Sequence, residues 1–169
     1  MSDFFAAPHL VITHLPVILT VVGAAATLLA LIVRKRGAWL YATATLALAG
    51  VSVVPTYLTG ESAEEKIEHA WYVSHEVIEE HELAGKWALW IVGAMGLVAA
   101  YAWWRARRSA AVDGGLPVWL RAVVLVMALW GATTLYVTAE HGGDIVHRSR
   151  HLAPNLAPPS STTVPGGQK

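Results

Sequence analysis

The sequence predicts an all-α protein built as a bundle of four transmembrane helices. The chain has 169 residues, of which 55% are hydrophobic, whereas ordinary soluble domains contain about half at most. Four apolar runs reach the ~20 residues that an α-helix needs to cross a bilayer. Basic and acidic residues lie at opposite ends of these runs, as in multi-pass membrane proteins. We therefore expect the lipid bilayer to be the first partner of this chain.

The first predicted span covers residues 10–33. A polar start without basic residues precedes it, and it runs into Arg34, Lys35 and Arg36 where a secretory signal would have small residues for cleavage. We therefore expect a retained span. His14 lies about one turn inside it, where an imidazole is costly unless it has a partner. The simpler alternative is a half-hydrated residue near the lipid headgroups.

The second predicted span covers residues 38–58 and is rich in Ala and Thr. Gly50 and Pro55 predict a closely packed helix with a kinked outer end. Small residues of this kind admit a neighbouring helix or a flat cofactor, and plain helix packing is the simpler interpretation.

The third predicted element is one long helix that extends beyond the membrane. Ser62, followed by Glu64 and Glu65, resembles a helix start, so we expect an outer helix over 62–82 and a span over 83–104. One helical stripe carries Ile67, Trp71, Ser74, Ile78, His81 and Gly85. His81 lies at the edge of this stripe and His75 lies beside it, so both are expected to face the bundle. Lys86 is expected to extend outward or to meet a carboxylate or a haem propionate.

The fourth predicted span covers residues 118–139. We expect Gly142 and Gly143 to end this helix, so that the following residues fold back over the mouth of the bundle. The membrane domain then covers 1–151. Residues 152–169 form a tail rich in Pro, Ser and Thr, which is typical of a linker or of a strap along a partner.

The charge pattern predicts the orientation. Basic residues gather between the first and second and between the third and fourth spans, at Arg34, Lys35, Arg36, Arg105, Arg107 and Arg108, with Arg121 close by. Asp113 is the one acidic residue on that side. The positive-inside rule places that side in the cytoplasm. We expect a bacterial inner-membrane protein with both termini outside, a functional face toward the periplasm and no nucleic-acid partner.

The chain has no cysteine and eight histidines. This composition excludes disulfides, iron–sulfur clusters and covalently attached haem, so a cofactor must be held by nitrogen or oxygen ligands. All the histidines fall at the predicted outer side. A zincin motif is not formed, because His81 follows His75 by six residues instead of four. His75 and Glu79 remain candidates for binding a divalent ion.

The residue types favour a non-covalent b-type haem. Such a haem needs histidines from separate helices, small residues beside the porphyrin and basic groups near its propionates. The candidate axial pair for the iron is His14 and His81. The further candidates for one or two haems are His9, His75, His141 and His147 as ligands, with Arg148, Arg150 and Lys86 near the propionates. A quinone is a second possible cofactor.

Three short segments resemble a family of small four-helix bacterial membrane proteins of uncharacterised function. They are Pro8-His9-Leu10-Val11-Ile12-Thr13-His14-Leu15-Pro16, His81 followed by Leu83-Ala84-Gly85, and Gly142-Gly143-Asp144-Ile145-Val146. The family pattern has His-x4-His-Phe-Pro in the first span, a histidine opening the third, and Gly-Gly-x-Leu-Val-Tyr after the fourth. Leu15 and His147 depart from it. The resemblance implies a four-helix fold and a histidine-lined outer pocket suspected of binding haem, without fixing a reaction.

The function expected from the sequence is a membrane-anchored b-type cytochrome subunit. It would transfer electrons between a quinol pool and a periplasmic redox partner, such as a soluble cytochrome. Two alternatives stay open: a non-catalytic accessory subunit of a larger respiratory or photosynthetic membrane complex, and a binder of divalent metal at the periplasmic face. Electron transfer within a complex is favoured over a stand-alone enzyme.

Overall fold

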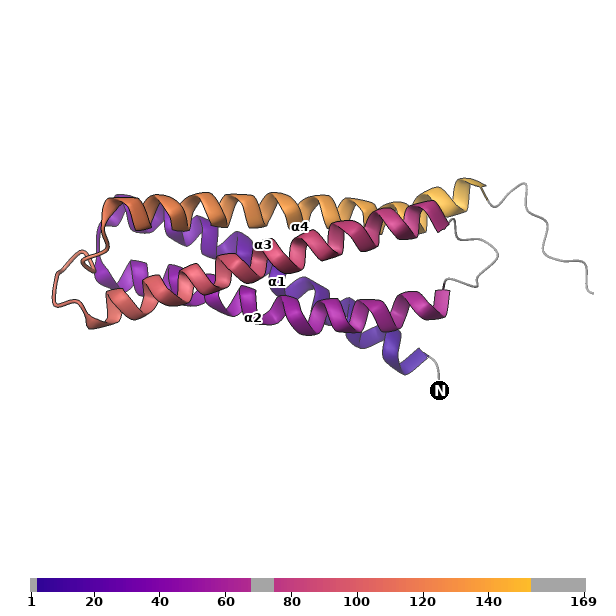
Figure 1. Cartoon of the computed structure of the whole chain (residues 1–169), viewed down its shortest axis with the longest axis horizontal. Helices are drawn as coiled ribbons and strands as arrows, with labels where there is room; N and C mark the ends of the chain where they lie inside the picture. Colours follow the sequence, from indigo (N-terminus) through magenta and orange to yellow (C-terminus); the bar gives the residue numbers. More distant parts are fainter. Residues whose placement is uncertain (1–2, 68–74, 153–169) are drawn as a thin grey trace, which may run out of the picture.

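A computed structural model describes residues 3–67 and 75–152, with side chains for 12–60 and 78–143. It contains four helices: α1 (Asp3–Val33), α2 (Arg36–Ile67), α3 (His75–Arg108) and α4 (Val118–Leu152) (Figure 1). Each helix includes a segment long and apolar enough to cross a membrane, over Ile12–Val33, Arg36–Gly60, Ile78–Arg108 and Val118–Gly143. The predicted all-α bundle of four membrane spans is confirmed.

The four helices pack in a ring. α1 and α3 each contact both α2 and α4, so α1 and α3 lie on a diagonal of the bundle. The connections at 34–35 and 109–117 lie together at one end, which we call the arginine end (Figure 1). The opposite end, where α1 begins and α4 ends, is called the histidine end. There α1 lies beside α2 and away from α4, whereas α3 approaches α4 (Figure 1).

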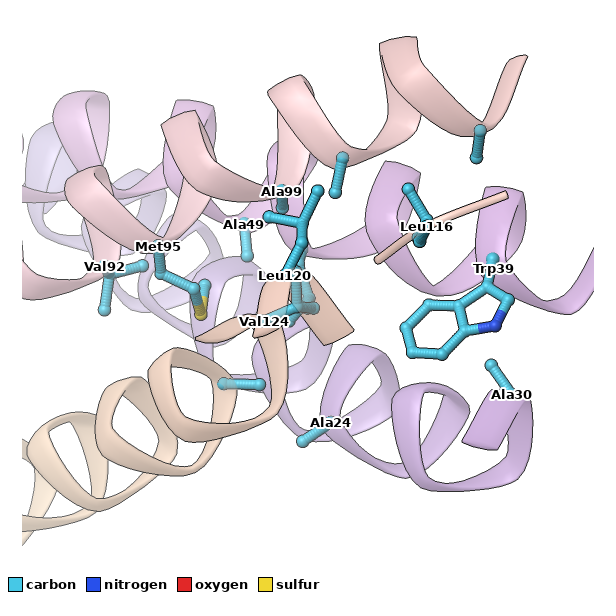
Figure 2. Close-up of a cluster of buried hydrophobic side chains, with 14 of the residues drawn as sticks. Ala24, Ala30, Trp39, Ala49, Val92, Met95, Ala99, Leu116, Leu120 and Val124 are labelled. Carbon is cyan, nitrogen blue, oxygen red and sulfur yellow. The ribbon is translucent and has the colours of Figure 1, made fainter. Parts of the chain in front are cut away.

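Small residues allow the helices to approach closely. A Cβ built on Gly50 of α2 would lie 2.5 Å from the Cα of Gly96 on α3, so the two backbones touch at this crossing. Alanine dominates the buried core between the crossing and the arginine end, together with Trp39, Leu120 and Val124 (Figure 2). Such contacts supply the van der Waals packing that associates helices in lipid. Helix packing thus accounts for Gly50.

Buried hydroxyl groups bond within their own helices. The Thr27 hydroxyl donates to the Gly23 carbonyl (2.8 Å) and the Thr43 hydroxyl donates to the Trp39 carbonyl (2.6 Å). Bonds of this kind satisfy a polar group where no water is available. Thr20 differs: it is fully buried, and among the described residues its hydroxyl has no hydrogen-bond partner.

Two helix boundaries differ from the sequence prediction. Ser62 does not start the third helix, because α2 continues to Ile67 and α3 begins at His75. Ser62, Glu64 and Glu65 lie within the last turns of α2. A capping signal has no effect there, because the helix has already begun. The second error concerns Gly142 and Gly143, which lie inside α4 instead of ending it. Each glycine costs a helix only about 1 kcal/mol, which tertiary packing can offset.

The outer surface of the bundle is apolar. Large hydrophobic side chains are exposed on every helix, including Ile32 on α1, Val51 on α2, Leu97 on α3 and Val126 on α4. A soluble monomer rarely exposes apolar surface this extensive. The four spans and this surface identify a multi-pass membrane protein that contacts lipid.

Candidate functional site at the histidine end

The imidazole of His81 lies between α3 and α4. A Cβ built on Gly142 would lie 3.1 Å from Cε1 and 3.5 Å from Nδ1 of His81, so the ring fills the space left by the missing side chain. The Nδ1 atom is inaccessible to solvent, while the residue as a whole is half-buried. His81 thus faces the bundle, as its place beside the helical stripe predicts.

His141 stands next to Gly142 on α4. Its Nδ1 atom is 2.7 Å from the carbonyl oxygen of Val137, one turn earlier. Because a carbonyl can only accept a hydrogen bond, Nδ1 is the protonated nitrogen and donates. The neutral ring then carries its lone pair on Nε2. This is the arrangement in which a histidine binds a metal, with the second nitrogen held by a backbone carbonyl.

A hydrogen bond joins α3 and α4 beside the two imidazoles. The hydroxyl of Thr138 donates to the carbonyl of Ala84 across the helix boundary (3.2 Å). Lys86 lies 2.6 Å from a carboxylate oxygen of Glu82 on the same helix. Of the partners predicted for Lys86, a carboxylate is therefore present. The Thr138 bond fixes the register of the segment that carries His81 against the segment that carries His141.

His14 lies on an exposed face of α1. The buried residues in the described part of α1 are Pro16, Thr20, Gly23, Ala24, Thr27 and Ala30, whereas His14 is exposed. Its position lies about 160° around the helix from Pro16. The structure brings the His81 ring and Gly142 together, and α1 lies beside α2 and away from α4 at this end (Figure 1).

Several predicted site residues fall outside the described side chains. They are His9, His75, His147, Arg148 and Arg150. Their roles as haem ligands or propionate partners stay predictions, as does the pairing of His14 with His81.

The donor groups described at this end can be compared with the needs of a metal ion and of a haem. Among the side chains that the structure describes, no three His, Asp or Glu residues gather where one metal ion could bind. A haem iron needs only one or two imidazoles, and His81 and His141 supply that chemistry. Farther into the bundle, a Cβ on Gly131 would lie 3.0 Å from the Met95 sulfur. Because the helices are closely packed around Gly131 and Met95, a haem would have to be held between these two residues and the histidine end.

An apolar groove of about 380 Å³ runs between α1 and α2. Its lining consists of Ile12, Leu15, Leu19, Leu48, Val51, Ser52 and Pro55. The hydroxyl of Thr56 donates to the carbonyl of Ile12 (3.3 Å), which joins the two helices at the histidine end of the groove. Sequence reasoning did not predict this groove, since it depends on how two helices diverge.

The role of Gly142 was also missed, although the sequence contains a signal for it. Positions facing the bundle on α4 recur at spacings of four and three residues, through Val124, Ala128, Gly131, Leu135, Thr138 and Gly142. Continuing that stripe places Gly142 on the face that meets α3.

The chain was also compared with known proteins. No family model, no curated protein and no solved structure matches it significantly.

Proposed function

We propose that the chain is a membrane-anchored b-type cytochrome subunit that passes electrons between a quinol pool and a periplasmic redox partner. The observation that carries this proposal is the meeting of α3 and α4 at the histidine end. There the His81 ring rests on Gly142, and the adjacent His141 presents Nε2 with its lone pair. Imidazoles anchored in this way are the usual ligands of a non-covalent haem.

In this proposal, His81 and His141 hold the haem iron. A bound haem b supplies one-electron transfer, and the chain supplies the oriented imidazoles. The Gly142 backbone packs against the His81 ring, and the Val137 carbonyl fixes the His141 tautomer. The pair predicted from the sequence, His14 with His81, belongs to the same function and differs in its second ligand.

The surroundings of the two imidazoles support an electron-transfer partner. Glu79, Glu80 and Glu140 are exposed near them, and carboxylates of this kind attract a basic carrier such as a soluble cytochrome. The periplasmic location rests on the positive-inside rule, and the resemblance to histidine-containing four-helix membrane proteins agrees with it. The groove between α1 and α2 is apolar and beside lipid, as the chain of a quinol requires.

The test is a spectrum of the full-length protein purified from membranes. We expect a reduced-minus-oxidised spectrum with the α-band of a b-type haem. His81→Ala and His141→Ala should each lose or shift that band, because each removes an iron ligand. His14→Ala is the matched control, since it removes an imidazole from the same end on an exposed face of α1. Loss of the band in His14→Ala with retention in His141→Ala would assign the second ligand to α1.

A protein that shows no α-band when prepared with sufficient haem would overturn the proposal. Co-purification of a cofactor-free chain with other membrane subunits would then indicate the accessory role. Stoichiometric divalent metal without haem absorbance would indicate the metal-binding role.

A further inference from the structure

A cavity at the arginine end is separate from the histidines. It has a volume of about 370 Å³ and is lined by Trp104, Arg105, Arg108, Ser109 and Gly115. The first three belong to the last turns of α3, and Ser109 and Gly115 belong to the connection between α3 and α4. The cavity thus lies where a predicted membrane span ends.

The positive charge of this cavity is uncompensated. Among the residues that the structure describes, neither Arg105 nor Arg108 forms an ion pair with a carboxylate. Asp113 is the one acidic residue of the connection, and it pairs with Arg121 at 2.5 Å. Two guanidinium groups without a carboxylate favour an anionic ligand, and their planar donor pattern suits a phosphate.

The polar groups of the cavity are held in place. The guanidinium of Arg108 lies over the Trp104 ring, 4.4 Å from its centroid, which restricts its position through a cation–π contact. The Ser109 oxygen accepts a hydrogen bond from the Ala111 N–H (3.1 Å), which leaves the hydroxyl proton to donate. Gly115 has φ +60°, and a Cβ there would overlap the Ser109 hydroxyl, so glycine keeps the connection close to the cavity.

An exposed apolar stripe leads away from the cavity along α3. Leu97, Tyr101, Trp104 and Arg108 follow one another at spacings of four, three and four residues, so they share one face of the helix. The apolar members are 76%, 44% and 44% exposed, respectively. Tyr101 and Trp104 stack with their centroids 6.1 Å apart. A ligand with its anionic group at the arginines would extend its hydrocarbon along this stripe.

We propose that the cavity binds the headgroup of an anionic phospholipid, with the phosphate between Arg105 and Arg108 and an acyl chain along Tyr101 and Leu97. The uncompensated arginines account for the charge of the ligand. The apolar stripe favours a lipid over a soluble phosphate, because inorganic phosphate has no hydrocarbon chain to contact it. Basic pockets at the ends of membrane helices bind anionic headgroups through the same forces.

The test compares lipid binding by two double variants of equal net charge. Arg105→Gln with Arg108→Gln removes both guanidinium groups of the cavity. The matched control is Arg34→Gln with Arg107→Gln, because both control residues are exposed at the same end and neither lines the cavity. The full chain is titrated with phosphatidylglycerol, phosphatidylcholine of the same acyl chains, or inorganic phosphate, and bound ligand is counted by native mass spectrometry.

We expect the wild type to retain phosphatidylglycerol in preference to phosphatidylcholine. The cavity variant should bind phosphatidylglycerol at least roughly tenfold more weakly than the control variant, since it loses charge-assisted hydrogen bonds as well as net charge. Trp104→Leu keeps the charge and the apolar surface but removes the ring under Arg108, so it should weaken binding with circular dichroism unchanged. Equal losses in the two double variants would overturn the proposal, as would displacement of the lipid by inorganic phosphate at equal concentration.

Discussion

The ring of His81 on α3 occupies the space above Gly142 on α4, where a side chain would stand 3.1 Å from its Cε1 atom. A glycine inside a helix lowers the stability of that helix. Here the missing side chain leaves room for the His81 ring. Gly143, its neighbour, has nothing within 4 Å of a built Cβ. The two glycines therefore make a matched pair with different expected responses to the same substitution.

Gly143→Ala should raise the stability of the protein by up to about 1 kcal/mol, since alanine is the better helix former. Gly142→Ala should gain less or lose stability, because the new methyl group pushes the His81 ring by a few tenths of an ångström. Thermal unfolding in detergent measures the difference. The imidazole nuclear magnetic resonance shifts of His81 should move only in the Gly142 variant; equal shifts in both would contradict the contact.

Gly50→Ala should destabilise the bundle by about 1–3 kcal/mol, the usual cost of overpacking a close contact. Its methyl group would meet the Cα of Gly96, and a backbone atom cannot rotate away. Gly93→Ala is the control, because it lies on the same helix as Gly96 with open space around it. Chemical denaturation of both variants should separate them; a Gly50 variant as stable as the Gly93 variant would show that the helices do not touch there.

Thr20→Val should stabilise the protein by roughly 1 kcal/mol. The substitution replaces a fully buried hydroxyl, which has no partner among the described residues, with a methyl group of similar volume. Thr27→Val is the comparison, since its hydroxyl bonds to the Gly23 carbonyl. That variant should be neutral or less stable. If Thr20→Val proves the more damaging of the two, a hydrogen-bond partner such as a buried water must be present.

The Asp113 carboxyl makes the connection between α3 and α4 sensitive to acid. A hydrogen bond from Arg121, followed by one from the Gly115 N–H, holds the pKa of Asp113 below its ordinary value of 3.8. The folded state therefore favours the carboxylate. Its contribution to stability is present above the ordinary pKa and is lost as the pH falls through the lowered one.

Asp113→Asn should consequently lower the stability of this connection at neutral pH, and the difference from wild type should shrink in acid below about pH 4. Hydrogen exchange of the Gly115 amide reports on the connection directly. A difference that stays constant from pH 7 to pH 3 would show that the carboxylate charge does not contribute.

The sequence was sufficient for the class of fold, because the length and polarity of each membrane span are fixed by the bilayer. It also placed His81 at the bundle face, since α3 keeps its helical period through that residue. It failed at Ser62 and at Gly142, where local signals for a helix start and a helix end are overridden by a helix already formed and by packing between helices. Sequence spacing alone could not show that His14 is exposed, because its exposure depends on how α1 is rotated against its neighbours.

The contact between Gly50 and Gly96 determines how closely α2 and α3 cross. A larger side chain at this crossing would push the two helices apart, because it would meet backbone atoms of the neighbouring helix. The spacing of α2 and α3 is thus set within the span by two residues that have no side chain of their own.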